Sequence, residues 1–364
     1  MINIGFFPSR RLAWYMVRLF LTRSLAVLIA LVLILMTLDL LGESGKILAV
    51  PGNSDADLWR YVGLRVPMLI SRFLPFSVLL GTLIAFVSLN QNSEVVAMKA
   101  AGLSAHQILA PLVVASIGIA AALFAFNEGV VVNSTRAVSA WSDNDYKPVP
   151  RSSGILSNVW VLRGDDFIRA RIVGGKPFVA RQVTIYDRTG GVLERVIQAD
   201  LAVPRPSGDW LMRNVRIYDA NMNLVRSFPE MTGMQGVTPN QLTLAKVDPT
   251  ELDYWTLRTR IAELEAAGRP VDEARAGLAH KISGPLSTLL MPLLAAVAAF
   301  GLARSGQVLV RAAAGMALGF AYFMIDNFSL AMGDAGTYPP LVAAWAPFLL
   351  FLLIGETVLI RTEE

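Results

Sequence analysis

Long apolar runs alternate with polar stretches along the chain, and the length of these runs predicts membrane-spanning helices. A helix needs about 20 mostly apolar residues to cross the roughly 30 Å of hydrocarbon in a bilayer. Six runs, taken with their flanking residues, reach this length: 25–41, 61–89, 108–126, 282–303, 312–332 and 341–360. The sequence therefore predicts an α-helical membrane protein with three spans before a long polar insertion and three spans after it.

The insertion follows a different pattern. From residue 133 to residue 277 no apolar run is long enough to span, and apolar residues alternate with polar ones, which is typical of half-buried strands. Candidate strands lie at residues 159–162, 167–173, 178–186, 210–218 and 242–247. Residues 183–187 (VTIYD) and 215–219 (VRIYD) are alike, and each is followed by a turn and a further strand, at Leu193 and Leu224. Unless this likeness is chance, the paired hairpins predict an antiparallel sandwich or jelly roll.

Basic residues at the ends of the runs predict how the chain crosses the membrane. Four arginines between residues 10 and 23 precede the first span and Arg361 follows the last. Since cytoplasmic flanks carry the excess of Lys and Arg, both termini are expected in the cytoplasm and the insertion outside. A signal peptide is the alternative for the first run, but the run exceeds a usual h-region and no small-residue cleavage site follows promptly. The expected domains are residues 1–132 with spans one to three, 133–277 as the inserted all-β domain, and 278–364 with spans four to six.

The composition agrees with a membrane protein and narrows the chemistry. Hydrophobic residues make up 54% of the 364 residues and charged residues 16%, whereas soluble domains carry about 25% charged residues. The net charge of +4 is small, and clusters of basic residues at the ends of apolar runs indicate membrane topology, so nucleic acid is not an expected partner. There is no cysteine, and His106 and His280 lack a metal-ligand spacing. Residues 42–46 (GESGK) are too short for a nucleotide loop and no hydrolase motif occurs, so neither catalysis nor a bound cofactor or metal is expected.

The polar segment between the second and third spans carries the signals of a short helix with defined ends. Asn92 is the expected N-cap, and Glu94 lies in the first turn, where a carboxylate interacts favourably with the helix dipole. Gly102 is expected to take the left-handed conformation that ends a helix. Ser104 and Gln107 then form the S-x-x-Q pattern of a capping box, which starts the next helix. This amphipathic helix is either a connector between two spans or a docking surface for a partner.

Cations close to the spans are the candidates for substrate contacts, because charge is costly in lipid. Arg65 and Arg72 are seven residues apart in the second span and share a helix face. With Arg136 and Lys46 they form a set of cations expected on the outer side of the membrane. These side chains either anchor helix ends at the interface or bind an anionic ligand.

Two carboxylates lie inside predicted spans, Asp326 in the fifth and Glu356 in the sixth. Each is expected either to find a hydrogen-bond partner on a neighbouring helix or to take part in transport. The first interpretation requires no function beyond packing and is preferred.

Several motifs together resemble one family. They are Pro67 with Pro75 and LLG at 79–81, SEVVAMKAAG at 93–102, VTPNQL at 237–242 with VDP at 247–249, and FG at 300–301 with Arg304. With the three-plus-three spans around a β domain, they resemble the LptF/LptG family of lipopolysaccharide export permeases, most closely its LptG members. One stretch departs from the family, because residues 36–43 (MTLDLLGE) replace lysines that some members carry along and beyond the first span. Arg65, Arg72 and Arg136 are therefore the candidates for the cationic lining.

The resemblance implies a fold of six transmembrane helices with a periplasmic β-jelly roll, in the bacterial inner membrane. It implies a permease that pairs with an LptF-type permease and extracts lipopolysaccharide from the outer leaflet of that membrane. An LptB ATPase dimer would use ATP and Mg²⁺ and dock on a coupling helix at about residues 92–102, where Glu94, Val95, Met98 and Gly102 are the expected coupling residues. LptC and the periplasmic bridge would receive the lipid.

Two other functions remain open on the sequence. The chain could transmit movement to periplasmic partners as a membrane subunit of an ABC-type complex without itself conducting lipid. Alternatively, it could be a membrane-bound enzyme acting on envelope glycans. That function requires convergent carboxylates or a metal cluster in the β domain, and the sequence reveals neither.

Overall fold

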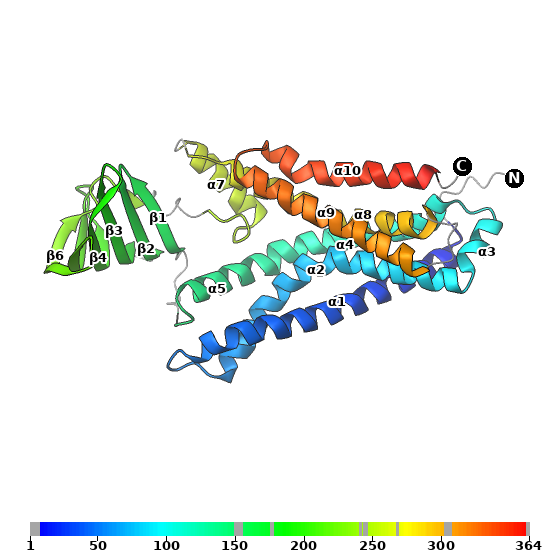
Figure 1. The fold of residues 1–364 in the computed structure, drawn as a ribbon, viewed down its shortest axis with the longest axis horizontal. Coiled ribbons are helices and arrows are strands. Elements are labelled where there is room, and N and C mark those ends of the chain that lie inside the picture. The colour runs from blue at the N-terminus through cyan, green and yellow to red at the C-terminus, as the bar shows by residue number, and fades with distance from the viewer. Residues whose placement is uncertain are drawn as a thin grey trace. The chain divides into compact units, whose positions relative to one another are not determined.

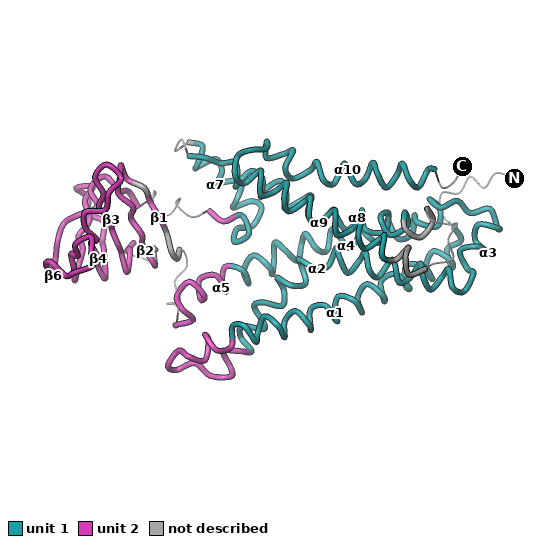
Figure 2. The backbone as a smooth tube through the Cα atoms, in the orientation of Figure 1, with its two compact units in different colours: residues 1–43, 59–135, 249–364 teal, residues 44–58, 136–248 magenta. Residues whose placement is uncertain are grey.

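The computed structural model describes residues 8–148, 156–174, 178–239, 242, 247–266, 269–301 and 308–361. The chain forms two compact units (Figure 2). The first, a helical unit, comprises residues 1–43, 59–135 and 249–364, and the second, a sheet unit, comprises residues 44–58 and 136–248.

Long helices running side by side make up most of the helical unit (Figure 1). In chain order the helices are α1 (Arg10–Leu48), α2 (Asp55–Gln91), α3 (Glu94–Ala100), α4 (Ala105–Phe126), the π-helix η1 (Asn127–Val131), α5 (Val132–Asp143), α7 (Tyr254–Ala266), α8 (Asp272–Gly301), α9 (Val308–Asp334) and α10 (Pro340–Arg361). The last residues of α1 and most of α5 belong to the sheet unit. The start of α1, the end of α10 and the short helix α3 lie at the same end of the helical unit (Figure 1).

Five helical segments in the described part of the chain are long and apolar enough to cross a membrane: Arg10–Leu48, Asp55–Gln91, Ala105–Asp143, Ala313–Asp334 and Pro340–Arg361. They correspond to the first three and the last two predicted spans. The fourth predicted span starts within α8, which is not among the five, and its residues 302 and 303 lie outside the described part of the chain.

The core of the helical unit is formed by apolar side chains of α2, α4, α8, α9 and α10, together with the start of α1. Phe86, Ile108 and Leu290 are at most 1% exposed there. Helix α1 differs from the others, because only 11% of its most apolar 18-residue stretch is buried. Beyond Phe20 it contributes a narrow stripe of buried residues, and most of its leucine and isoleucine side chains are exposed.

The sheet unit contains one antiparallel six-stranded sheet in the order β1-β2-β3-β4-β5-β6. The strands are β1 (Leu156–Arg163), β2 (Asp166–Gly174), β3 (Val179–Thr189), β4 (Val192–Pro204), β5 (Trp210–Asp219) and β6 (Leu224–Gly233). The two VTIYD-like pieces lie in β3 and β5, and the strands expected at Leu193 and Leu224 are β4 and β6. The inserted β domain is thereby confirmed.

The strand order differs in detail from the predicted jelly roll. A jelly roll places non-consecutive strands side by side, whereas the described strands all pair with their neighbours in sequence. Short turns cause this order: two residues separate β1 from β2 and β3 from β4, so each strand folds directly back on the preceding one. Most of the predicted strand at 242–247 lies outside the described residues.

Candidate functional site

The start of α3 differs from the expectation. Its N-cap is Ser93, which has a left-handed backbone (φ 58°) and makes no capping hydrogen bond through its side chain. Asn92 is wrongly predicted as the cap, because its backbone N–H still bonds to the carbonyl oxygen of Ser88 and so continues α2. The Asn92 amide nitrogen instead lies 3.4 Å from Oε1 of Glu94.

The end of α3 is confirmed as predicted. Gly102 has φ +85°, and the backbone N–H of Leu103 bonds to the carbonyl oxygen of Met98 at 3.1 Å. Ser104 and Gln107 then form both hydrogen bonds of the capping box, each at 3.1 Å. The connection from α3 to α4 is therefore short, residues 101–104, and its backbone is fixed by hydrogen bonds at both helix ends.

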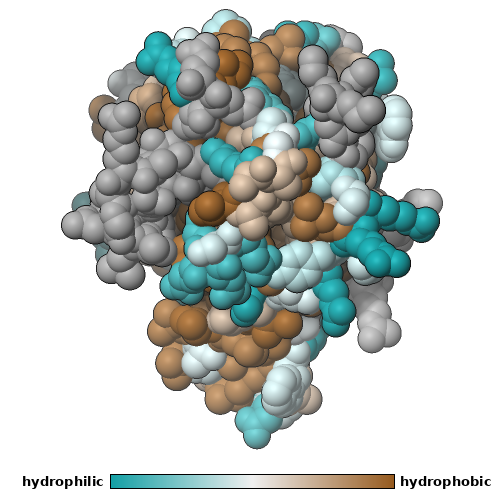
Figure 3. All heavy atoms as spheres, turned by 90° about the vertical axis from the view of Figure 1, so that its right-hand side faces the viewer, coloured by the Kyte–Doolittle hydropathy of each residue, from teal (hydrophilic) through white to brown (hydrophobic). Residues whose placement is uncertain are grey.

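Helix α3 has a buried face and an exposed face. Val95 and Met98 are 4% and 7% exposed and belong to the apolar core of the helical unit. These two predicted coupling residues therefore pack α3 against the other helices of the unit. The exposed face carries Val96, which is 65% exposed, and Lys99, with Glu94 half-buried beside them. Figure 3 views this end of the molecule, where hydrophilic and hydrophobic side chains lie next to each other.

Glu94 has a partner that sequence reasoning missed. The Tyr15 hydroxyl on α1 donates a hydrogen bond to Oε1 of Glu94 at 3.3 Å. The two residues are 79 positions apart, so no local pattern indicates the contact. The carboxylate expected to face a partner is thus also tied to the first span.

The arginine site also contains a residue that the sequence did not point to as a partner. Nε of Arg65 lies 3.0 Å from Oδ2 of Asp39, and Nη2 lies 3.1 Å from Oδ1. The Tyr61 hydroxyl donates a third hydrogen bond to Asp39, at 2.7 Å. Asp39 is in α1, within the stretch that departs from the family, while Arg65 and Tyr61 are in α2. Arg65 is therefore a bidentate partner of an internal carboxylate.

The other predicted cations are distributed over both units. Arg72 is exposed on α2, and no hydrogen bond or ion pair joins it to another residue in the described part of the chain. Arg136, on α5, and Lys46, near the end of α1, are exposed and belong to the sheet unit. Of the four candidates, the structure thus places Arg65 and Arg72 together in one unit.

The two carboxylates inside the spans both face histidines. Oε2 of Glu356 lies 3.3 Å from Nε2 of His106, and Oδ2 of Asp326 lies 4.0 Å from Nε2 of His280. These contacts join α10 to α4 and α9 to α8. The expected hydrogen-bond partner on a neighbouring helix is thus present for Glu356.

A part-buried ion pair contacts the π-helix. Nζ of Lys281 lies 3.0 Å from Oε1 of Glu128, and the two side chains are 12% and 17% exposed. The backbone N–H of Tyr254, at the start of α7, also bonds to Glu128. The pair therefore joins α8, η1 and α7.

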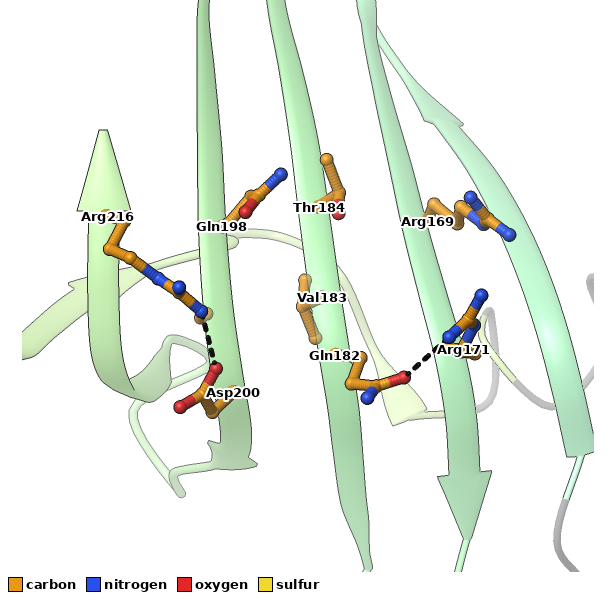
Figure 4. Close-up of a pocket in the computed structure, with 9 residues that line it drawn as sticks. Arg169, Arg171, Gln182, Val183, Thr184, Gln198, Asp200 and Arg216 are labelled. Atoms are coloured by element: carbon orange, nitrogen blue, oxygen red, sulfur yellow. Dashed lines mark hydrogen bonds and ion pairs between the residues drawn. The ribbon is translucent and has the colours of Figure 1, made fainter. Parts of the chain in front are cut away.

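A polar hollow of about 260 Å³ lies on the sheet, over strands β2 to β5 (Figure 4). Its charged side chains are Arg169, Arg171, Arg216 and Asp200. Nη2 of Arg216 lies 3.0 Å from Oδ1 of Asp200, and Nη1 of Arg171 lies 3.5 Å from Oε1 of Gln182. In the sequence, the alternation of polar and apolar residues along the strands indicates a polar face of the sheet, but not this hollow. Within the described residues, no group of three or more His, Cys, Asp or Glu side chains could hold a metal ion.

A family model described as "Lipopolysaccharide export system permease LptF/LptG" matches residues 14–361. The chain belongs to this family. It is 26% identical to the LptG permease protein of Escherichia coli K12 over 348 residues, which are 93% of this chain and 94% of that protein. It is 24% identical to LptG of Haemophilus influenzae over 86% of this chain and 89% of that protein. It is also 26% identical to LptF of Escherichia coli K12, over 94% and 92% of the two chains.

Membership of the LptF/LptG family makes this chain a permease of a lipopolysaccharide export system, and thus a transport protein rather than an enzyme. The family includes both LptF and LptG, so the chain is one member of a system with paired permeases. The family resemblance read from the motifs is therefore confirmed.

Proposed function

We propose that this permease is the LptG-type half of an ATP-driven exporter that extracts lipopolysaccharide from the outer leaflet of the bacterial inner membrane. An LptF-type permease forms the other half. A dimer of the ATPase LptB hydrolyses ATP with Mg²⁺, and LptC and the periplasmic bridge receive the lipid. The observation that carries this proposal is the construction of α3.

Helix α3 has the features of a docking element. Its buried Val95 and Met98 hold it on the bundle, and its exposed Val96, beside Glu94 and Lys99, leaves an apolar and charged surface for a partner. Only residues 101–104 separate it from α4, and hydrogen bonds at Leu103 and in the capping box fix the two helix ends on either side of this short connection. A closing ATPase dimer that pushes on α3 would therefore move α4 rather than deform the connection.

The arrangement at this end of the bundle supports an orientation in the membrane. The start of α1, the end of α10 and α3 lie together (Figure 1), and the arginines at residues 10–23 and 361 flank this end in the sequence. Since cytoplasmic flanks are rich in Lys and Arg, we place α3 and both termini in the cytoplasm. The β strands of the sheet unit then belong to the periplasm.

For the substrate path we propose Arg65 and Arg72 on α2, and, as separate candidates in the sheet unit, Arg136 and Lys46. Lipopolysaccharide combines phosphates with several acyl chains, so its site requires cations beside apolar helix surface. Arginine binds phosphate through two parallel hydrogen bonds, a geometry that lysine does not reproduce. Arg72 is exposed, so its guanidinium can form both hydrogen bonds to a phosphate.

Charge reversal at Glu94 tests the docking proposal. Glu94→Arg replaces attraction to a basic ATPase groove by repulsion, so it should reduce copurified ATPase at least tenfold, while Glu94→Gln should reduce it less. Tyr15→Phe is the matched control, because it removes the hydrogen bond inside the chain and leaves the carboxylate. If Glu94→Arg retains the ATPase, or Tyr15→Phe loses it equally, then Glu94 is not a docking residue.

One observation favours the second candidate function, a membrane subunit that transmits movement without conducting lipid. Arg65 is already neutralised by Asp39, which leaves fewer cations for a phosphate. Photocrosslinking from Phe73, next to Arg72 on α2, distinguishes the two functions: crosslinks to lipopolysaccharide support extraction, and their absence supports transmission alone.

A further inference from the structure

The contact between Asp39 and Arg65 has the same paired hydrogen-bond geometry as a contact between a phosphate and an arginine. Two nitrogens of the guanidinium contact two oxygens of the carboxylate, at 3.0 and 3.1 Å. This parallel arrangement is also the one in which arginine binds phosphate. A phosphate cannot use this side of the guanidinium while Asp39 is present.

We propose that Asp39 is an internal competitor of the substrate: it occupies Arg65 in the free permease and is displaced when a lipid A phosphate binds there. The inference rests on the proposed function, because it takes a phosphorylated lipid as the substrate. A phosphate monoester carries about −1.5 to −2 charges and three acceptor oxygens, so it can replace a carboxylate of charge −1. Asp39 thereby selects for strongly anionic headgroups over weakly anionic lipids.

Displacement of Asp39 releases α1 from α2. The outer half of α1 contributes a buried stripe formed by Leu28, Val32 and Met36, and Ile47 is buried near its end. Its other large apolar side chains there, such as Leu33 and Leu41, are 63% and 71% exposed. Since most large apolar side chains of this half are exposed, the three hydrogen bonds at Asp39 contribute to its attachment to α2.

The inner half of α1 is held differently. At Gly81 of α2 a Cβ atom would lie 2.4 Å from Oγ of Ser24 and 2.5 Å from its Cα, so the two helices cross in close contact there. Tyr15 then joins α1 to Glu94 of α3. Asp39 and Tyr15 lie 15 and 9 residues on either side of this crossing, or about 23 and 14 Å along the helix. Movement of the released outer half about the crossing would therefore reach the ATPase-docking helix.

The test measures binding of bisphosphorylated lipid A to the purified permease complex. Asp39→Asn keeps the shape of the side chain but removes the competing charge, and it should lower the lipid A concentration needed for half-saturation about fivefold. Lipid A without phosphates should show no such gain. Asp55→Asn, which removes an exposed carboxylate at the start of α2, is the charge control and should leave binding unchanged.

A double-mutant cycle shows whether the effect passes through Arg65. In an Arg65→Ala background, Asp39→Asn should bring no gain, because the cation that both anions contest is absent. If Asp39→Asn leaves lipid A binding unchanged while the parent complex binds lipid A, the competition is refuted and the proposed function stands. If the parent complex binds no lipid A, the proposed function itself fails.

Spin labels report the release of α1. The chain has no cysteine, so Leu41→Cys on α1 and Trp59→Cys on α2, which are 71% and 75% exposed, take two labels cleanly. Lipid A should broaden the label–label distance distribution in the parent, and Asp39→Asn should broaden it without lipid. A distribution that stays narrow in both cases overturns the release of α1.

Discussion

Helix α3 and the Asp39–Arg65 pair both place charge at the surface of the helical unit, but different forces hold them. At α3 apolar burial holds the helix in place, because Val95 and Met98 are buried in the core. Glu94 and Lys99 lie on the same short helix and are fixed by this burial. At Asp39 three polar hydrogen bonds hold α1, on a helix half with one narrow buried stripe.

This difference separates a rigid element from a releasable one. Buried apolar side chains cannot be exchanged for a ligand, and removing one costs about 2–5 kcal/mol. A partly exposed ion pair contributes about 1 kcal/mol or less, and another anion can take its place. The structure thus provides a fixed surface at α3, where we propose that the ATPase docks, and an exchangeable contact where we propose that substrate binds.

The largest expected effect concerns the side of the membrane on which each exposed region lies. Ser93→Cys, at the start of α3, should resist an impermeant maleimide in intact spheroplasts, whereas Ser207→Cys, in the turn between β4 and β5, should react. Both serines are exposed and the chain is free of cysteine, so the labels are specific. Equal labelling rates at the two positions would contradict the assigned orientation.

Truncation of the buried face of α3 should have the next largest effect. Met98→Ala should lower the free energy of unfolding by about 2–5 kcal/mol, because it opens a cavity in the core beneath α3. It should also raise hydrogen exchange across residues 94–104. Val96→Ala on the exposed face is the matched control and should change stability by less than about 0.5 kcal/mol while weakening ATPase copurification. If Val96→Ala destabilised the protein more than Met98→Ala, the assignment of the buried and exposed faces of α3 would be contradicted.

The crossing of α1 and α2 should tolerate no extra atom. Gly81→Ala should lower the free energy of unfolding by about 1–3 kcal/mol, because the new methyl group meets the backbone of Ser24, which cannot rotate away. Gly63→Ala, in the same helix with nothing within 4 Å, should be neutral or stabilise by up to about 1 kcal/mol. Thermal unfolding of the two variants in detergent measures the difference, and similar midpoints would argue against a close crossing.

The smallest effects are expected at the two polar contacts of α1. Asp39→Asn should cost about 1 kcal/mol or less, because the pair is partly exposed. Tyr15→Phe should cost about 0.5 kcal/mol, since it removes one long hydrogen bond at the surface. Denaturant midpoints of the purified permease provide both values. A cost at Tyr15 well above that at Asp39 would place the stronger attachment of α1 at its inner end.

The sequence by itself determined the features that depend on a few consecutive residues. Five of the six predicted spans follow from apolar run lengths, and the six-stranded insertion follows from alternation and turns. Gly102 ends α3, and Ser104 with Gln107 starts α4, because hydrogen bonds within a single turn decide both. Even so, the N-cap of α3 was misplaced, because Asn92 stays in the last hydrogen bond of α2.

Only the tertiary structure decided which charges meet. Asp39 and Arg65 are 26 positions apart, and His106 and Glu356 are 250 apart. Their pairing depends on where two helices cross and how far each is rotated about its axis, which no local pattern specifies. The same rotation buried Val95 and Met98 and left Val96 outside. The sequence therefore located the charged segments, and helix packing selected the partner of each charge, because interhelical contacts depend on the position and rotation of whole helices.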